Sequence, residues 1–201
     1  MAQLKNTQIT GDLVVIKDGV EVNILDAINE LRNTTAKSGG YIEIERGGNV
    51  TNYSSDYNAF TPFSGSDINV TAQKGNLSLS SDVFDYSDRS NQTVYGIRVG
   101  AGISMVKVTS ITTYVSEGSN TTVRNSITRY RPSDESRTTF GSYAYLFRGA
   151  STERHTYTHS AFMDVQEGDL IYVWAYKYAK AGNIDVYADF HGTKLIAEVV
   201  E

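Results

Sequence analysis

Two histidines four residues apart are the side chains whose type and spacing first suggest metal chemistry. His155 and His159 fall in a segment of alternating polarity, and on a β-strand both would point to the same face. A stable metal site needs further ligands, and no carboxylate stands at a ligand spacing from this pair. We therefore expect hydrogen-bonded or solvent-facing histidines and predict no metal site. A ring of such histidines around the axis of an oligomer is the alternative.

The sequence gives equally little support for a catalytic nucleophile, a phosphate-binding site or a calcium site. The 201 residues include no Cys, no Gly-x-Ser-x-Gly elbow that would present a serine nucleophile, and no Gly-rich phosphate loop. Asp82, Asp85 and Asp88 could supply oxygen ligands for Ca²⁺, but their spacing differs from that of an EF-hand, so we expect a solvated acidic loop. The sequence thus predicts neither catalytic residues nor a cofactor.

Aromatic side chains beside basic ones are the remaining chemical signal in a chain that has 14 Tyr. An exposed ring can cover one face of a sugar while neighbouring polar groups bind its hydroxyls. On this basis we predict four candidate receptor-binding residues: Tyr86, Arg129, Tyr130 and Arg131. The alternative is that these tyrosines are ordinary half-buried residues at strand ends.

Composition and charge limit the class of protein and its location. A net charge of −5 and a pI of about 5.2 argue against a nucleic-acid binder, which needs a basic face. No stretch approaches the roughly 20 apolar residues that cross a bilayer, and the N-terminus lacks the apolar run of a signal peptide. We therefore expect no membrane insertion and no secretory route. A surface rich in Asn, Ser and Thr, without Cys, fits a virion protein made in a host cytoplasm.

Residues 1–38 are predicted to form an N-terminal anchor. An apolar run at 13–16 and an alternating segment at 20–22 flank an Asp-Gly turn and predict a hairpin, and residues 24–32 have a helical pattern. A helix this short is marginal alone in water and needs a partner surface. Its narrow apolar stripe would serve either as a seam between three copies or as a packing face on its own domain. The trimerisation residues predicted for the first case are Ile24, Ile28 and Leu31.

The rest of the chain is predicted to form a linker or shoulder, residues 39–66, and a head domain, residues 67–201. Within the shoulder, residues 41–46 alternate between apolar and polar, which predicts a strand with one buried face. The head domain shows short strand patterns separated by turn signals, with no helical pattern between them. Such a series predicts an antiparallel sandwich, and its strand number matches a two-sheet jelly roll. The strand predicted at 170–178 is apolar or aromatic on both faces, so it should be central or be covered by another subunit.

Three segments carry a resemblance to known families. Residues 161–173 run from an alternating strand through Gly168-Asp169 into an apolar strand, which resembles the late strands of C1q/TNF-like jelly rolls. Residues 95–108 are similar to an earlier strand pair of that fold, and residues 6–15 are similar to the start of many bacteriophage tail-fibre and head-fibre proteins. Taken together, the chain resembles a small trimeric bacteriophage fibre or receptor-binding protein.

This resemblance implies a mainly β fold: a C-terminal jelly-roll β-sandwich, C1q/TNF-like and homotrimeric, behind a short N-terminal hairpin and helix. It also implies a place in the virion and supplies no catalytic residues. The chain departs from cellular C1q-like proteins because it has no collagen-like Gly-x-y stretch.

We therefore expect a virion fibre protein, on the head or the tail, whose homotrimer displays the sandwich for multivalent binding to host-surface glycan. The expected partners are other virion structural proteins, through the N-terminal zone, and host cell-surface carbohydrate. One alternative is a structural capsid-decoration protein without a ligand. The other, a glycan-degrading enzyme, has less support because no paired carboxylates stand out in the sequence.

Overall fold

The structure is a computed structural model that describes residues 14–17, 20–23, 40–53, 59–64, 67–86, 89–116, 121–147, 151–178, 184–187 and 192–200. The chain divides into two compact units, residues 1–38 and 39–201. In the first unit, β1 (Val14–Lys17) pairs antiparallel with β2 (Val20–Asn23), so the predicted hairpin is present. The predicted helix lies outside the described residues, and so do Ile24, Ile28 and Leu31.

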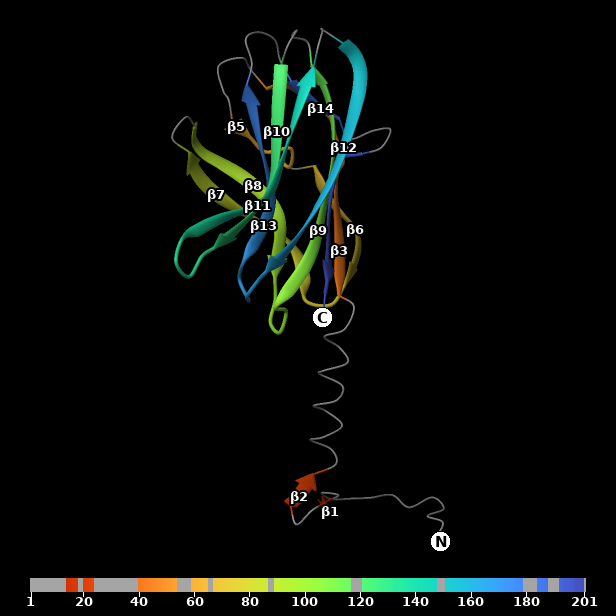
Figure 1. Cartoon of the computed structure of the whole chain (residues 1–201), viewed down its shortest axis with the longest axis vertical. Helices are drawn as coiled ribbons and strands as arrows, with labels where there is room; N and C mark the ends of the chain where they lie inside the picture. Colours follow the sequence, from red (N-terminus) through yellow and green to blue (C-terminus); the bar gives the residue numbers. More distant parts are fainter. Residues whose placement is uncertain are drawn as a thin grey trace. The chain divides into compact units, whose positions relative to one another are not determined.

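Two antiparallel sheets build the second unit (Figure 1). The six-stranded sheet has the order β11-β10-β13-β8-β7, with β5 paired to β13. Its strands are β5 (Ala59–Phe60), β7 (Leu77–Tyr86), β8 (Arg89–Val99), β10 (Thr121–Arg131), β11 (Ser136–Phe147) and β13 (Leu170–Tyr178).

The seven-stranded sheet has the order β4-β14-β9-β15-β3-β6, with β12 paired to β9. Its strands are β3 (Tyr41–Arg46), β4 (Val50–Tyr53), β6 (Ile68–Lys74), β9 (Met105–Ser116), β12 (Ser151–Asp164), β14 (Ile184–Tyr187) and β15 (Lys194–Val199). The chain passes from one sheet to the other on each side of β5, β9 and β12, between β6 and β7, and between β13 and β14. These crossings confirm the predicted jelly-roll sandwich.

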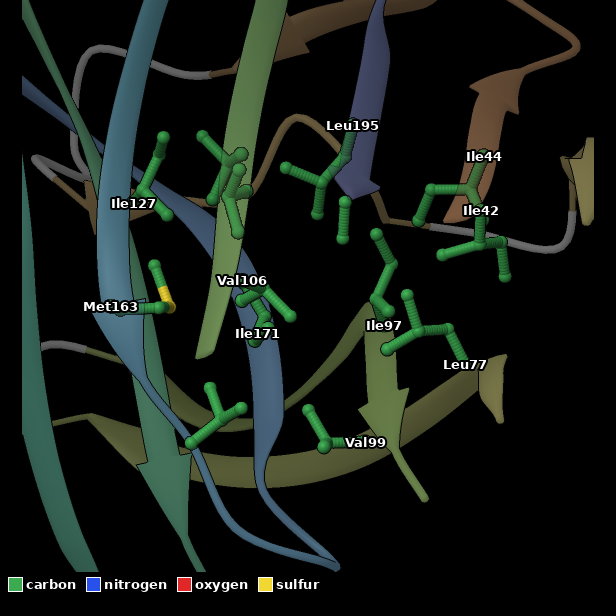
Figure 2. Packing of buried hydrophobic residues seen from close by; sticks show 14 of the residues in the cluster. Ile42, Ile44, Leu77, Ile97, Val99, Val106, Ile127, Met163, Ile171 and Leu195 are labelled. Carbon is green, nitrogen blue, oxygen red and sulfur yellow. The ribbon is translucent and has the colours of Figure 1, made fainter. Parts of the chain in front are cut away.

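The core lies between the two sheets. Alternate residues of each strand point inward, and Ile42 and Leu195 of the seven-stranded sheet are fully buried in one cluster with Ile97 and Ile171 of the six-stranded sheet (Figure 2). Burying one such side chain contributes about 1.5–3 kcal/mol to folding. The period-two pattern of the sequence is thus the physical basis of the sandwich.

The central position predicted for the strand at 170–178 is what the structure shows. β13 lies between β10 and β8, and its Ile171 faces the core. On the other face, Tyr172 is 1% exposed in a second cluster with Val94 and Leu170, against which Tyr130 and Trp174 pack. Side chains of the same chain therefore bury Leu170 and Tyr172 on this face.

Two segments differ from their predicted roles. The segment predicted as a linker or shoulder, 39–66, supplies β3, which pairs with both β6 and β15 inside the seven-stranded sheet. Asp82 and Asp85 of the predicted acidic loop lie in β7, whose backbone pairs with β8. Aspartate suits β7 despite its low strand propensity because β7 ends the strand order of its sheet, and charges at a sheet edge oppose aggregation.

Within the described part of the chain, no helix has the length and apolar character that a membrane span requires.

Candidate functional site

The outward face of the seven-stranded sheet is the candidate functional surface of the second unit. It consists of the alternate residues of β3, β15, β9 and β12 that point away from the core. Because residues paired directly across antiparallel strands share one face, the strand register fixes which of them lie side by side. The members of this outward face are Tyr41, Glu43, Glu45, Lys194, Ile196, Glu198, Met105, Lys107, Thr109, Ile111, Ser160 and Phe162.

Large apolar side chains are exposed on this face. Phe162 is 61% exposed, Met105 43% and Tyr41 40%. Ile196 and Ile111 are half-buried on the same face, in the next two cross-strand rows, where they pair with Glu43 and Lys194 respectively. Single exposed apolar residues are normal on a protein surface, but several on one sheet face indicate a contact surface for another protein.

The charged residues of the outward face pair with one another. The Lys107 ammonium lies 3.4 Å from the Glu198 carboxylate. Lys194 donates a 2.8 Å hydrogen bond to Glu43, and its ammonium lies 3.5 Å from Glu45. The hydrogen bond with Lys194 lowers the pKa of Glu43, and the same bond raises the pKa of Lys194. Each charge therefore has a partner within the chain, which reduces the cost of covering this face with a second protein.

Small polar groups on the same face are also internally satisfied. The hydroxyls of Thr109 and Ser160 form a 2.7 Å hydrogen bond between neighbouring strands. Thr71 of β6 donates a 2.9 Å hydrogen bond to the Glu43 carboxylate. The face thus presents apolar side chains among polar groups that already have partners, a composition close to that of protein interfaces.

The receptor-binding candidates Arg129 and Arg131 lie at the end of β10, where their guanidinium groups bind two aspartates. Arg129 donates 2.7 Å hydrogen bonds to the backbone carbonyl and the carboxylate of Asp164. Arg131 binds the fully buried carboxylate of Asp169 through two bonds of 3.1 and 3.0 Å. The backbone N–H of Gln166 donates a further bond to Asp169. This network ties β10 to the turn between β12 and β13.

The same network shifts the proton affinity of its members. The hydrogen bond from Arg129 lowers the pKa of Asp164, and the bidentate bond to Asp169 raises the pKa of Arg131. The Arg129 side chain is only 7% exposed, and its guanidinium carbon lies 5.1 Å from the ring centroid of Phe140. These contacts give Arg129 a structural role at the strand end.

The two candidate tyrosines lie on different strands. Tyr130 is half-buried, and the guanidinium carbon of Arg137 lies 5.5 Å from the centroid of its ring. Tyr86 ends β7, where its backbone pairs with Arg89. Because β13 and β8 stand between β10 and β7, the sheet does not place these two positions on neighbouring strands. Receptor binding by these residues stays a prediction.

The two histidines of β12 occupy different environments. His159 is 8% exposed, and this burial lowers its pKa. His155 is half-buried, and its ring stacks with that of Tyr157 at a centroid distance of 6.3 Å. Among the residues that the structure describes, no group of three or more His, Asp or Glu side chains could hold a metal ion.

Sequence reasoning missed the outward face as a contact surface. Its most exposed apolar residue, Phe162, stands between Ala161 and Met163, so both alternating positions of β12 look apolar. The signal that could have found it is an apolar residue at one of the strand positions that alternate with the buried ones. To use this signal, one must know which of the two alternating sets of positions is buried.

Comparisons with known proteins show the class of fold. No protein-family model and no curated protein sequence matches the chain. Among solved structures, murine APRIL at pH 5.0 is similar over 81% of this chain and 100% of its own, with a TM-score of 0.53 and 12% identity. Eiger TNF from S. frugiperda is similar over 82% of this chain and 92% of its own, with a TM-score of 0.51 and 10% identity. The chain therefore has a TNF-like jelly-roll fold.

Proposed function

We propose that this protein is a bacteriophage virion fibre protein, of the head or the tail, that forms a homotrimer and displays its sandwich for multivalent binding to host-surface glycan. In this proposal the second unit is the displayed binding domain. Residues 1–38 join the protein to other virion structural proteins. The protein is made in the host cytoplasm and acts as part of the particle.

The observation that supports the trimer best is the set of exposed apolar residues on the outward face. Phe162, Met105 and Tyr41 would be covered if this face met other copies of the chain. A second copy is the occupant that the chain itself supplies, and its association would bury apolar area at roughly 25 cal/mol per Å² before the costs of association. The fold shared with TNF proteins is consistent with this arrangement.

Trimerisation would raise the overall affinity of a protein whose individual binding sites are weak. One copy that binds a sugar weakly becomes effective when three copies on one fibre, and many fibres on one particle, bind a surface together. The mechanism needs no covalent step. It requires only that the binding site remain open while Phe162, Met105 and Tyr41 are covered.

Mass measurement of the full chain in solution tests the assembly. We expect a trimer at micromolar concentration, and a stable monomer there would overturn the proposal. Labelling the protein on intact particles then assigns it to the head or the tail. Binding of the labelled trimer to host cells, with competition by free host glycan, tests the adhesive role.

A capsid-decoration protein is the second candidate, favoured if the isolated trimer binds capsids but has no affinity for host cells. A glycan-degrading enzyme is the third. It would be favoured by release of reducing sugar from host wall material.

A further inference from the structure

A polar cleft of about 460 Å³ opens at the β6 edge of the outward face, at the opposite end of β3 from Tyr41. It is lined by the strand end and the turn that follows it, and by two residues of the neighbouring strand β6. Its volume lies in the range of small-molecule sites, roughly 300–1,000 Å³. The lining residues are Glu45, Arg46, Gly47, Gly48, Asn49, Asn69 and Thr71.

The strand end that lines the cleft is fixed at Arg46, whose side chain points to the other side of β3 from Glu45. Arg46 is 3% exposed, and its guanidinium donates 2.8 Å hydrogen bonds to the carbonyls of Pro62 and Ser64. Its backbone N–H also donates a 2.9 Å bond to the carbonyl of Thr193. A wall fixed in this way does not have to be ordered when a ligand arrives, which reduces the cost of binding.

Two glycines, Gly47 and Gly48, form the part of the cleft wall that follows β3. The Gly47 N–H donates a 2.7 Å hydrogen bond to the carbonyl of Asp67. A Cβ atom at Gly47 would lie 2.6 Å from Nδ2 of Asn69, and one at Gly48 would lie 2.9 Å from Oδ2 of Asp67. A side chain at either position would therefore displace the end of the Asn69 or the Asp67 side chain, whereas the glycines leave both side chains in place beside the turn.

The chemistry of the lining selects the class of ligand. None of the lining side chains is aromatic or aliphatic, which disfavours a lipid or an apolar peptide. The amides of Asn49 and Asn69 both donate and accept hydrogen bonds, as the hydroxyls of a sugar do. The Glu45 carboxylate disfavours an anion.

We propose that this cleft binds a neutral saccharide. The inference deepens the proposed function, because it rests on glycan binding and names both the site and the class of sugar. It places the sugar at the end of β3 and not at the Arg129–Arg131 end of β10. We expect a single-site Kd on the order of 1 mM for a polar cleft without an aromatic platform, strengthened by trimer avidity.

The test uses the full chain, labelled and applied to an array of neutral and acidic oligosaccharides built from hexoses and N-acetylhexosamines. We expect binding to neutral members. Asn69→Ala and Asn49→Ala should each weaken it by about tenfold, because each removes an amide that bonds the sugar. Asn76→Ala is the matched control, since Asn76 follows the far end of β6 and bonds the Ala101 carbonyl. Melting and mass measurements establish that each variant is folded and assembled.

The possible results distinguish failure of the cleft as the binding site from failure of the glycan-binding function. Loss of binding in both cleft variants, with binding retained in Asn76→Ala and Tyr130→Ala, supports the cleft. If wild-type protein binds saccharide and only Tyr130→Ala loses it, the cleft is overturned and the glycan-binding function stands. A preference for acidic saccharides also overturns the cleft. If a folded trimer binds no saccharide at all, the cleft and the glycan-binding part of the proposed function both fail.

Discussion

Tyr41 and Phe162 lie in one cross-strand row of the outward face, with Glu198 and Lys107 between them. The row crosses four strands in the order β3, β15, β9 and β12. Its centre is an ion pair and its flanks are exposed aromatic rings. A row of this kind can contact another copy through its rings without leaving a charge unpaired.

Replacing Phe162 by Glu should weaken the trimer. The substitution puts a charge where we expect an apolar contact, and loss of an interface anchor worth about 2 kcal/mol raises a dissociation constant roughly 30-fold. The mass of the assembly, measured over a dilution series, gives the change. The side chain is exposed in a single copy, so the sandwich itself should keep its fold.

Thr139→Glu is the control for this prediction. Thr139 is exposed on β11 of the other sheet, so the same charge there should leave the dissociation constant unchanged. Equal dissociation of both variants and the wild type would show that the outward face is not the assembly surface.

The N-terminal zone makes a separate prediction about assembly. Ile28→Asp should destabilise the trimer if the predicted helix forms a seam between copies, because a charge in an apolar seam is costly. Sedimentation and thermal melting measure the effect. Should this variant remain trimeric with unchanged melting, the helix is not the assembly element, and Phe162→Glu alone would then report on assembly.

Most of the fold can be predicted from the residue patterns within individual strands. The alternation in β3 and the apolar run of β13 were visible in the sequence, and both strands lie where their patterns require. The turn at Gly168-Asp169 was equally visible, and Gly168 has a φ of +89°, a conformation that glycine adopts without strain.

Register and distant partners could not be predicted. Arg129 stands in a dense group of basic and aromatic residues before a Pro turn, and nothing near it in the sequence indicates its ion pair with Asp164 at the end of another strand. The cleft depends on Gly47 approaching Asn69, which follows from the pairing of β3 with β6. Such pairings are set by packing of the whole sandwich and leave no short-range signal.

Asp169→Asn should lower the stability of the sandwich by about 3 kcal/mol, because it removes the charged acceptor of a largely desolvated ion pair. The Asp169 side chain is fully buried and accepts both bonds from Arg131. Chemical denaturation measures the difference in the free energy of unfolding. Asp134→Asn is the matched control at an exposed aspartate of the same corner, which accepts a 3.0 Å bond from the Ser136 N–H. A loss in Asp169→Asn no larger than in this control would contradict a structural role for the network.

Acid should weaken the sandwich through His159 before it affects the aspartates. Burial lowers the pKa of His159 from its usual value near 6.5, so the unfolded chain takes up a proton that the folded chain excludes. Stability is therefore complete above pH 6.5 and falls as the pH drops below it. The lowered pKa values of Asp164 and Glu43 have the same sign, but their stabilisation is present above their usual values of 3.8 and 4.5 and is lost only at lower pH. Melting temperatures between pH 7.5 and 5, compared with those of His159→Gln, isolate the histidine. We expect the variant to show the shallower dependence, and parallel curves for the two proteins would exclude His159 as the cause.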